Sequence, residues 1–139
     1  MKTMKIEDDI TVVYIKAKSF PDGIFQAQER IRTVVGATPE RRFFGISRPE
    51  EELEGAIEYK AAAEEKTPGE LSLLDLPSMV IRKGQYVYID VKDYNNHLEK
   101  IGEAFGELTD QEGIDPQGYC VEWYQGDDVK CMVRLAAAK

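Results

Sequence analysis

An alternating pattern of apolar and polar residues opens the first half of the chain. Residues 12–17 alternate, with Val13, Ile15 and Ala17 on one face and Val12, Tyr14 and Lys16 on the other, and this period of two predicts a half-buried strand. Between residues 24 and 34 the apolar positions recur at helical spacing, with Gln28 among the polar positions, which predicts an amphipathic helix. Two further strands are predicted at residues 43–47 and 56–62, so the order is strand, helix, strand, strand.

The second half of the chain repeats this order. Residues 79–91 predict an extended segment, and residues 96–111 carry apolar side chains at helical spacing. Strands are predicted at 118–125 and 128–136, and the Gly126-Asp127 pair between them is typical of a short hairpin turn.

Short sequence matches between the halves indicate an internal duplication. Val13-Tyr14-Ile15 recurs 74 residues later as Val87-Tyr88-Ile89. Two further matches lie at nearly the same offset and pair residues 42–46 with 118–122 and 56–60 with 129–133. Three matches in the same order favour a duplication, which constrains the fold more tightly than residue propensities do.

The duplication predicts the fold class and the domain plan. We expect an α+β fold of two β-α-β-β units with pseudo-two-fold symmetry, a mainly antiparallel sheet and two helices. A chain of 139 residues has the usual size of one domain. The single domain 1–139 is therefore expected to hold repeat units at about 10–63 and 78–137, joined by a linker at 64–77.

The last predicted hairpin isolates one charged residue. If Gly126 and Asp127 form the loop, Glu122 faces Cys131 across the hairpin and Tyr124 faces Val129. Glu122 is then the only charged residue on a side made up of Cys120, Glu122, Tyr124, Val129, Cys131 and Val133. An unpaired carboxylate on an apolar face is unfavourable, and burial raises its pKa.

Three interpretations of Glu122 follow from the residues. In the first, the Glu122 carboxylate accepts a hydrogen bond from a tyrosine hydroxyl or a backbone amide, or pairs with a lysine, within the fold, or a shifted register exposes it to water. Alternatively, the carboxylate binds an organic cation in an aromatic cavity, where ring faces add cation–π attraction. In the third interpretation, Glu122 has a raised pKa and acts as a general acid or base beside a tyrosine hydroxyl.

The aromatic residues of the second half are candidates for such a cavity. Tyr86 and Tyr88 share one face of their strand, whereas Val87 and Ile89 lie on the other face. We expect the aliphatic face to pack against the helix, so the tyrosines line another surface or a cavity.

Charge and hydropathy exclude several classes of partner. The net charge is −8 and the pI is near 4.8, so direct binding to nucleic acid is not expected. The acidic field attracts organic cations, although it also serves to keep a protein soluble. No apolar run approaches the roughly 20 residues that span a bilayer, and the charged start is unlike a signal peptide, so we expect no membrane partner and a cytoplasmic protein.

The residues give no reason to expect a cofactor or a metal ion. Cys120, Cys131 and the single histidine, His97, do not supply a zinc site, and a catalytic triad would have to centre on His97. No glycine-rich phosphate loop follows a strand. The cysteines are interpreted as small core residues, and the acidic runs at 50–52 and 64–65 as solvated surface.

The strand motifs of the second half resemble those of a known family. Residues 84–89, Gly-Gln-Tyr-Val-Tyr-Ile, and residues 121–124, Val-Glu-Trp-Tyr, are similar to strands of GyrI-like effector-binding domains, the ligand-sensing modules of many AraC- and MerR-type regulators. Residues 98–108 are similar to the helix between these strands, and the likeness extends over about 10–136. Some members stand alone, among them integron-associated effector-binding proteins.

The resemblance implies a multidrug-type pocket between the two halves of the domain. Carried onto this chain, it implies that Glu122, Tyr124 and Tyr86 bind a cationic or amphipathic aromatic ligand. Tyr88, Trp123, Phe44 and Tyr59 are further candidates. Residues 92–96 depart from the family, which often has a Gly-Pro pair after this strand, so the rim of the pocket differs.

The same resemblance implies two alternatives to a ligand-binding protein linked to transcription regulation. Some members look like hydrolases, which would use the same Glu122 and tyrosine pocket. Others inhibit DNA gyrase, and a module of that kind would contact a protein partner through acidic surface such as residues 50–52 or 64–65. A chain of this length has no room for a helix-turn-helix beside the predicted domain.

Overall fold

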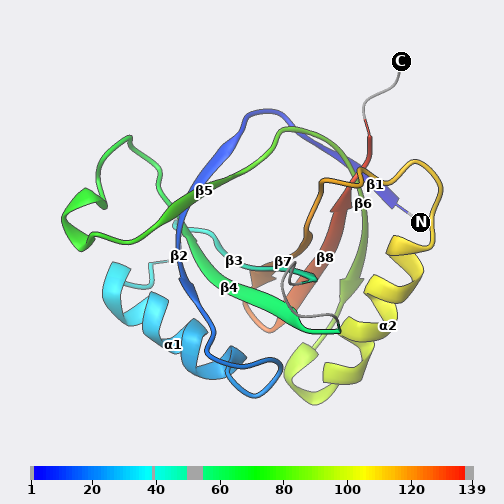
Figure 1. Cartoon of the computed structure of the whole chain (residues 1–139), viewed down its shortest axis with the longest axis horizontal. Helices are drawn as coiled ribbons and strands as arrows, with labels where there is room; N and C mark the ends of the chain where they lie inside the picture. The colour runs from blue at the N-terminus through cyan, green and yellow to red at the C-terminus, as the bar shows by residue number, and fades with distance from the viewer. Residues whose placement is uncertain (1, 39, 50–54, 137–139) are drawn as a thin grey trace. The chain divides into compact units, whose positions relative to one another are not determined.

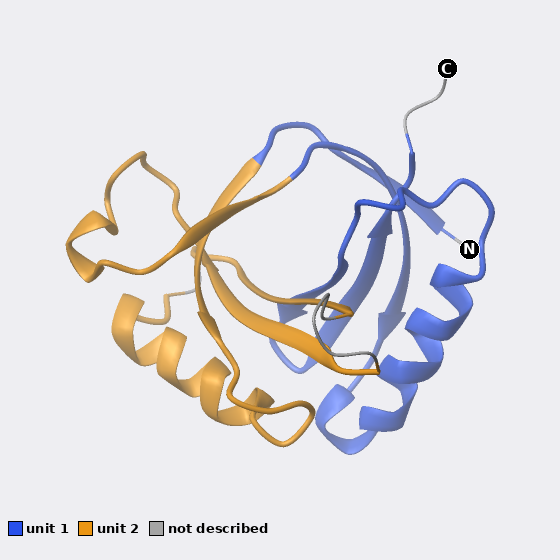
Figure 2. Cartoon of the chain, viewed as in Figure 1, with its two compact units in different colours: residues 1–9, 82–139 blue, residues 10–81 orange. Residues whose placement is uncertain are grey.

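The computed structural model describes residues 2–38, 40–49 and 55–136 (Figure 1). These residues form two compact units, shown in different colours in Figure 2. Unit 1 consists of residues 1–9 and 82–139, and unit 2 consists of residues 10–81. The chain thus passes from one unit to the other twice.

Unit 2 is an antiparallel four-stranded sheet with one α-helix. Its strands follow the order β3-β4-β2-β5, and every pairing between them is antiparallel. The elements are β2 (Ile10–Lys16), α1 (Ile24–Val35), β3 (Phe43–Pro49), β4 (Ile57–Glu64), the 3₁₀ helix η1 (Ser72–Leu74) and β5 (Ser78–Ile81).

The core of unit 2 lies between α1 and one face of this sheet. Ala27 and Ile31 sit one helical turn apart on α1 and pack with Val13, Phe43 and Tyr59 of the sheet. Gln28, which the helical pattern puts among the polar positions, is in fact buried beside them. The burial of this polar side chain is explained by the hydrogen-bond partners of its amide on the sheet.

Unit 1 has the same architecture. Its strands follow the order β1-β6-β8-β7, again with antiparallel pairing. The elements are β1 (Lys2–Ile6), β6 (Gly84–Val91), the 3₁₀ helix η2 (Tyr94–Asn96), α2 (Leu98–Thr109), β7 (Cys120–Gln125) and β8 (Asp128–Arg134). Ala104 and Leu108 of α2 pack on Val87, Val129 and Cys131.

The predicted fold class is confirmed. Both units contain the strand, helix, strand, strand order, in a mainly antiparallel α+β fold with two α-helices. The extended segment predicted at 79–91 is two strands, because β5 pairs with β2 in unit 2 whereas β6 belongs to unit 1. β1, which the sequence did not predict, pairs with β6 as β5 pairs with β2.

Strand register corrects two of the three sequence matches between the halves. Tyr14 pairs with Ala62 in unit 2, and the equivalent Tyr88 pairs with Met132 in unit 1. Ala62 and Met132 are therefore equivalent, which shifts the alignment of 56–60 with 129–133. Phe44, the partner of Ala62, is likewise equivalent to Val121, the partner of Met132.

Neither helix is suited to crossing a bilayer. Within the described residues, no helix combines the necessary length with the necessary apolar run.

Candidate functional site

Glu122 lies in the middle of β7, on the side of the sheet that faces α2. The predicted hairpin register is confirmed, because Glu122 pairs with Cys131 and Tyr124 pairs with Val129. Directly opposed residues of antiparallel strands share a face, and Cys131 packs in the core with Leu108 of α2. The backbone of the β7–β8 hairpin therefore directs the Glu122 carboxyl towards the apolar side of unit 1.

The Glu122 carboxyl is buried, and its hydrogen-bond partner among the described residues is Tyr124. The residue is 6% exposed, and Tyr124 Oη donates a hydrogen bond to its Oε1 at 3.0 Å. Within the described residues, Oε2 accepts no hydrogen bond and no lysine or arginine pairs with the carboxyl. Burial raises the pKa of Glu122 to about 7, against the smaller lowering effect of the Tyr124 hydrogen bond.

Two cysteines and two tyrosines lie near Glu122. Both cysteines are free thiols, and burial, followed by the nearby Glu122 charge, raises the pKa of each, to about 12 for Cys131. The Tyr94 ring packs against the Tyr124 ring with centroids 5.4 Å apart. No three His, Cys, Asp or Glu side chains of the described residues come together as metal ligands.

Tyr86, Tyr88 and Trp123 lie on the other face of the same sheet. Consecutive strand residues point to opposite faces, so Trp123 is turned away from Glu122 and shares its face with its partner Lys130. Tyr86 and Tyr88 are in register with Arg134 and Met132 on that face. The structure thus joins Glu122 to Tyr124 and places the other three aromatic candidates across the sheet from them.

Tyr86 is tied to the fold by its hydroxyl. Only 2% of the residue is exposed, and Oη donates a 2.6 Å hydrogen bond to the carbonyl of Arg82. Burial raises the pKa of Tyr86 to about 12, so the side chain stays neutral at physiological pH.

Phe44 and Tyr59, the candidates in unit 2, also lie on opposite faces of their sheet. Phe43 packs in the core under α1, so its neighbour Phe44 points to the other face, where it is fully buried. Tyr59 faces α1, and Gln28 Nε2 donates to its hydroxyl at 2.9 Å and to the Phe44 carbonyl at 3.0 Å. Gln28, which periodicity alone did not single out, therefore fixes Tyr59 within the core.

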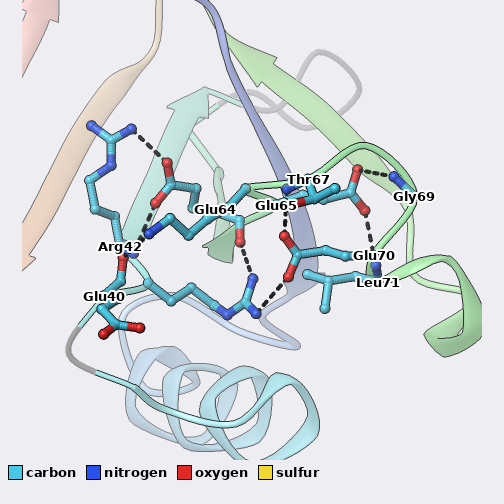
Figure 3. A network of polar contacts seen from close by, with 10 residues as sticks. Glu40, Arg42, Glu64, Glu65, Thr67, Gly69, Glu70 and Leu71 are labelled. Atoms are coloured by element: carbon cyan, nitrogen blue, oxygen red, sulfur yellow. Dashed lines mark hydrogen bonds and ion pairs between the residues drawn. The ribbon is translucent and has the colours of Figure 1, made fainter.

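The acidic residues 64–65 form a structural network, shown in Figure 3. Arg42 Nη2 donates to Glu64 Oε2 at 2.6 Å, and Glu65 accepts hydrogen bonds from the backbone N–H groups of Gly69 and Leu71. Burial would raise the pKa of Glu64, but the hydrogen bonds and charge of Arg42 outweigh it, so the pKa lies below its ordinary value. The interpretation of 64–65 as solvated surface is wrong for Glu64, which is buried, whereas Glu65 is half-buried. Residues 50–52 lie outside the described residues.

Comparison with known proteins identifies the fold but no family. No protein-family model and no curated protein matches the sequence. The solved structure of SAV2435 bound to tetraphenylphosphonium is similar, with a TM-score of 0.65 and 13% identity over 96% of this chain and 93% of that one. An integron cassette protein, VCH_CASS2, from the mobile metagenome of Vibrio cholerae matches with a TM-score of 0.60 and 12% identity, over 96% and 94% of the two chains.

In both comparisons the match extends over nearly the whole of this chain and nearly the whole of the solved structure. At such low identity the comparison shows the fold alone. Membership of the GyrI-like family stays a resemblance carried by short strand motifs.

Proposed function

We propose that this chain is a small-molecule binding protein that takes up lipophilic organic cations, with the ionised carboxylate of Glu122 as their charge partner. The observation that carries the proposal is a buried carboxyl with one tyrosine partner and no cationic partner among the described residues. The similar fold of SAV2435, whose solved structure contains tetraphenylphosphonium, supports the choice of ligand class.

The geometry at Glu122 leaves one carboxyl oxygen for a ligand. Tyr124 holds Oε1 through its 3.0 Å hydrogen bond and so orients the carboxyl group. Oε2 accepts no hydrogen bond from the described residues, and its negative charge in a poorly hydrated site attracts a cation more strongly than it would in water.

The same burial selects for a lipophilic cation. A compact, strongly hydrated ion loses much solvation energy on entering an apolar site, whereas a large organic cation has a weaker hydration shell to lose. Aromatic faces add attraction on the order of 0.5–2 kcal/mol each, and Tyr94 and Tyr124 lie together at this end of the site.

A matched pair of ions tests the charge requirement. We would titrate the protein at pH 8 with tetraphenylphosphonium and with tetraphenylborate, which has the same shape and the opposite charge, by isothermal titration calorimetry. The wild type is expected to bind the cation and not the anion, and Glu122→Gln to weaken cation binding at least tenfold. Glu103→Gln removes an equal charge from the exposed face of α2 and is expected to change nothing. Equal binding of both ions, or full binding by Glu122→Gln, would contradict the proposal.

The pKa of Glu122 gives this binding a defined pH dependence. With a pKa of about 7, roughly a tenth of the carboxyl is ionised at pH 6 and roughly nine tenths at pH 8. Because the cation binds the ionised form, affinity should be about tenfold weaker at pH 6 than at pH 8. Binding near pH 7 should also release protons, so the measured enthalpy should vary with the ionisation heat of the buffer.

The pKa near 7 also favours a second candidate function, proton transfer in a hydrolase. A general base works best when its pKa lies near the operating pH, and Glu122 meets this condition. Hydrolysis of an activated ester such as p-nitrophenyl acetate that disappears in Glu122→Gln would favour the enzyme. Cation binding without such turnover would favour the binding protein.

A further inference from the structure

The Lys130 side chain occupies a cation-binding arrangement on the face of unit 1 that points away from Glu122. Its Nζ lies 3.7 Å from the centroid of the Tyr88 ring and 3.0 Å from Asp90 Oδ1. Register places Asp90 directly opposite Lys130 on β6 and Trp123 directly opposite it on β7. The Lys130 side chain is only 14% exposed, so neighbouring groups cover most of its surface.

This set of neighbours has the chemistry of an ammonium site. Aromatic faces with a nearby carboxylate attract cations, and aromatic side chains are the groups that bind methylated ammonium ligands in proteins. A lysine ammonium is compact and strongly hydrated, so a quaternary ammonium loses less solvation energy on reaching the same position. The chain therefore fills with its own lysine a site that suits an organic ammonium ion.

Unit 2 contains a partial copy of the arrangement. Lys60 Nζ lies 4.7 Å from the centroid of the Tyr14 ring and 3.2 Å from Glu58 Oε1. Lys60 and Lys130 occupy equivalent positions, each two residues before the partner of the stacked tyrosine. The copy differs in two respects, because Ile46 replaces Trp123 opposite the lysine and Lys16 also pairs with Glu58, at 3.6 Å.

We propose that Lys130 is a specificity-determining residue, whose ammonium occupies a cation site formed by Tyr88 and Asp90 beside Trp123 and thereby excludes alkylammonium ligands from this face. The site lies across the sheet from Glu122 and does not depend on the function proposed for that residue. Removing the ammonium group opens the site to a quaternary ammonium ion.

The test replaces Lys130 with methionine, which keeps an unbranched side chain and removes the charge. The probe is benzyltrimethylammonium, titrated in the Glu122→Gln background so that binding at Glu122 does not contribute. Emission from Trp123, the only tryptophan of the chain, reports occupancy of the site, and calorimetry gives the affinity. We expect Lys130→Met to bind the probe at least tenfold more tightly than its Glu122→Gln parent, and Tyr88→Leu to abolish that gain.

Lys60→Met is the matched control within the same chain. It uncovers Tyr14 in the same way, but Ile46 rather than a tryptophan is in register with residue 60, and Lys16 stays paired with Glu58. We expect its gain to stay below threefold.

Two results would overturn the proposal. One is a Lys130→Met variant that binds no more tightly than its parent, and the other is a gain that persists after Tyr88→Leu. Circular dichroism verifies the fold of each variant, and Lys130→Gln replaces Lys130→Met if the latter does not fold. All these variants lack the Glu122 charge. The effect of Lys130→Met can therefore be interpreted even if Glu122 binds no cation in the wild type.

Discussion

Replacing Glu122 with glutamine should remove the pH dependence that this residue imposes on stability. The pKa of Glu122 is about 7 in the folded protein, against an ordinary value of 4.5 that applies to the unfolded chain. Between these pH values the folded state therefore holds a proton that the unfolded state has lost. Stability therefore falls as pH rises through this window. At about 1.4 kcal/mol per pKa unit, the free energy of unfolding of the wild type should fall by roughly 3 kcal/mol across this window. Glu122→Gln cannot ionise and should not show this loss.

The assay compares the free energies of unfolding of the two proteins in urea at pH 5, 6, 7 and 8. The advantage of Glu122→Gln over the wild type should grow by roughly 2–3 kcal/mol across this range, because the other titrating groups are common to both proteins and cancel. Glu103→Gln, on the exposed face of α2, should show a constant difference. A constant difference for Glu122→Gln as well would mean that the carboxyl is hydrated and titrates normally, which would refute the argument from burial.

Two further substitutions test the packing of unit 2. Gly45→Ala should destabilise the protein by about 1–3 kcal/mol, because a Cβ at this position overlaps the Tyr59 ring. Most of this loss should disappear in a Tyr59→Leu background. Equal losses in both backgrounds would contradict the contact between position 45 and Tyr59. Glu64→Gln should cost about 1–2 kcal/mol at pH 7 through its hydrogen bond with Arg42. Since the pKa of Glu64 is lowered in the fold, this contribution exists above pH 4.5 and is lost as pH falls through the folded pKa, which urea unfolding at pH 7 and pH 3 would detect.

The isolation of Glu122 was predictable because a two-residue turn fixes the register of a hairpin. Gly126-Asp127 determines which residues oppose each other on β7 and β8, and the alternation of a strand then assigns each side chain to a face. The duplication was visible for a similar reason, since Val13-Tyr14-Ile15 and its repeat occupy equivalent central strands. Local rules were sufficient in both cases.

The features that could not be predicted depend on contacts between distant segments. β1 is predominantly exposed and contains the two lysines Lys2 and Lys5, and it is a strand because β6, about 80 residues further along the chain, supplies its hydrogen-bond partners. The position of Lys130 over Tyr88 likewise requires the pairing of β6 with β8, for which no short turn sets the register. Gln28 is buried because Tyr59, on a strand that follows α1 by more than 20 residues, accepts its hydrogen bond.

The strand motif Val121-Glu122-Trp123-Tyr124 shows that the residues of a family motif must first be assigned to the two faces of the sheet. Only then can their roles be transferred to another chain. Glu122 and Tyr124 point to the α2 side of unit 1, where the tyrosine orients the carboxyl. Val121 and Trp123 point to the opposite side, where Trp123 is in register with Lys130. A single motif of four residues thus supplies an anionic group to one face and an aromatic group to the other. Variants of Glu122 and Lys130 change the chemistry of different surfaces, so each has to be judged with a ligand suited to its own face.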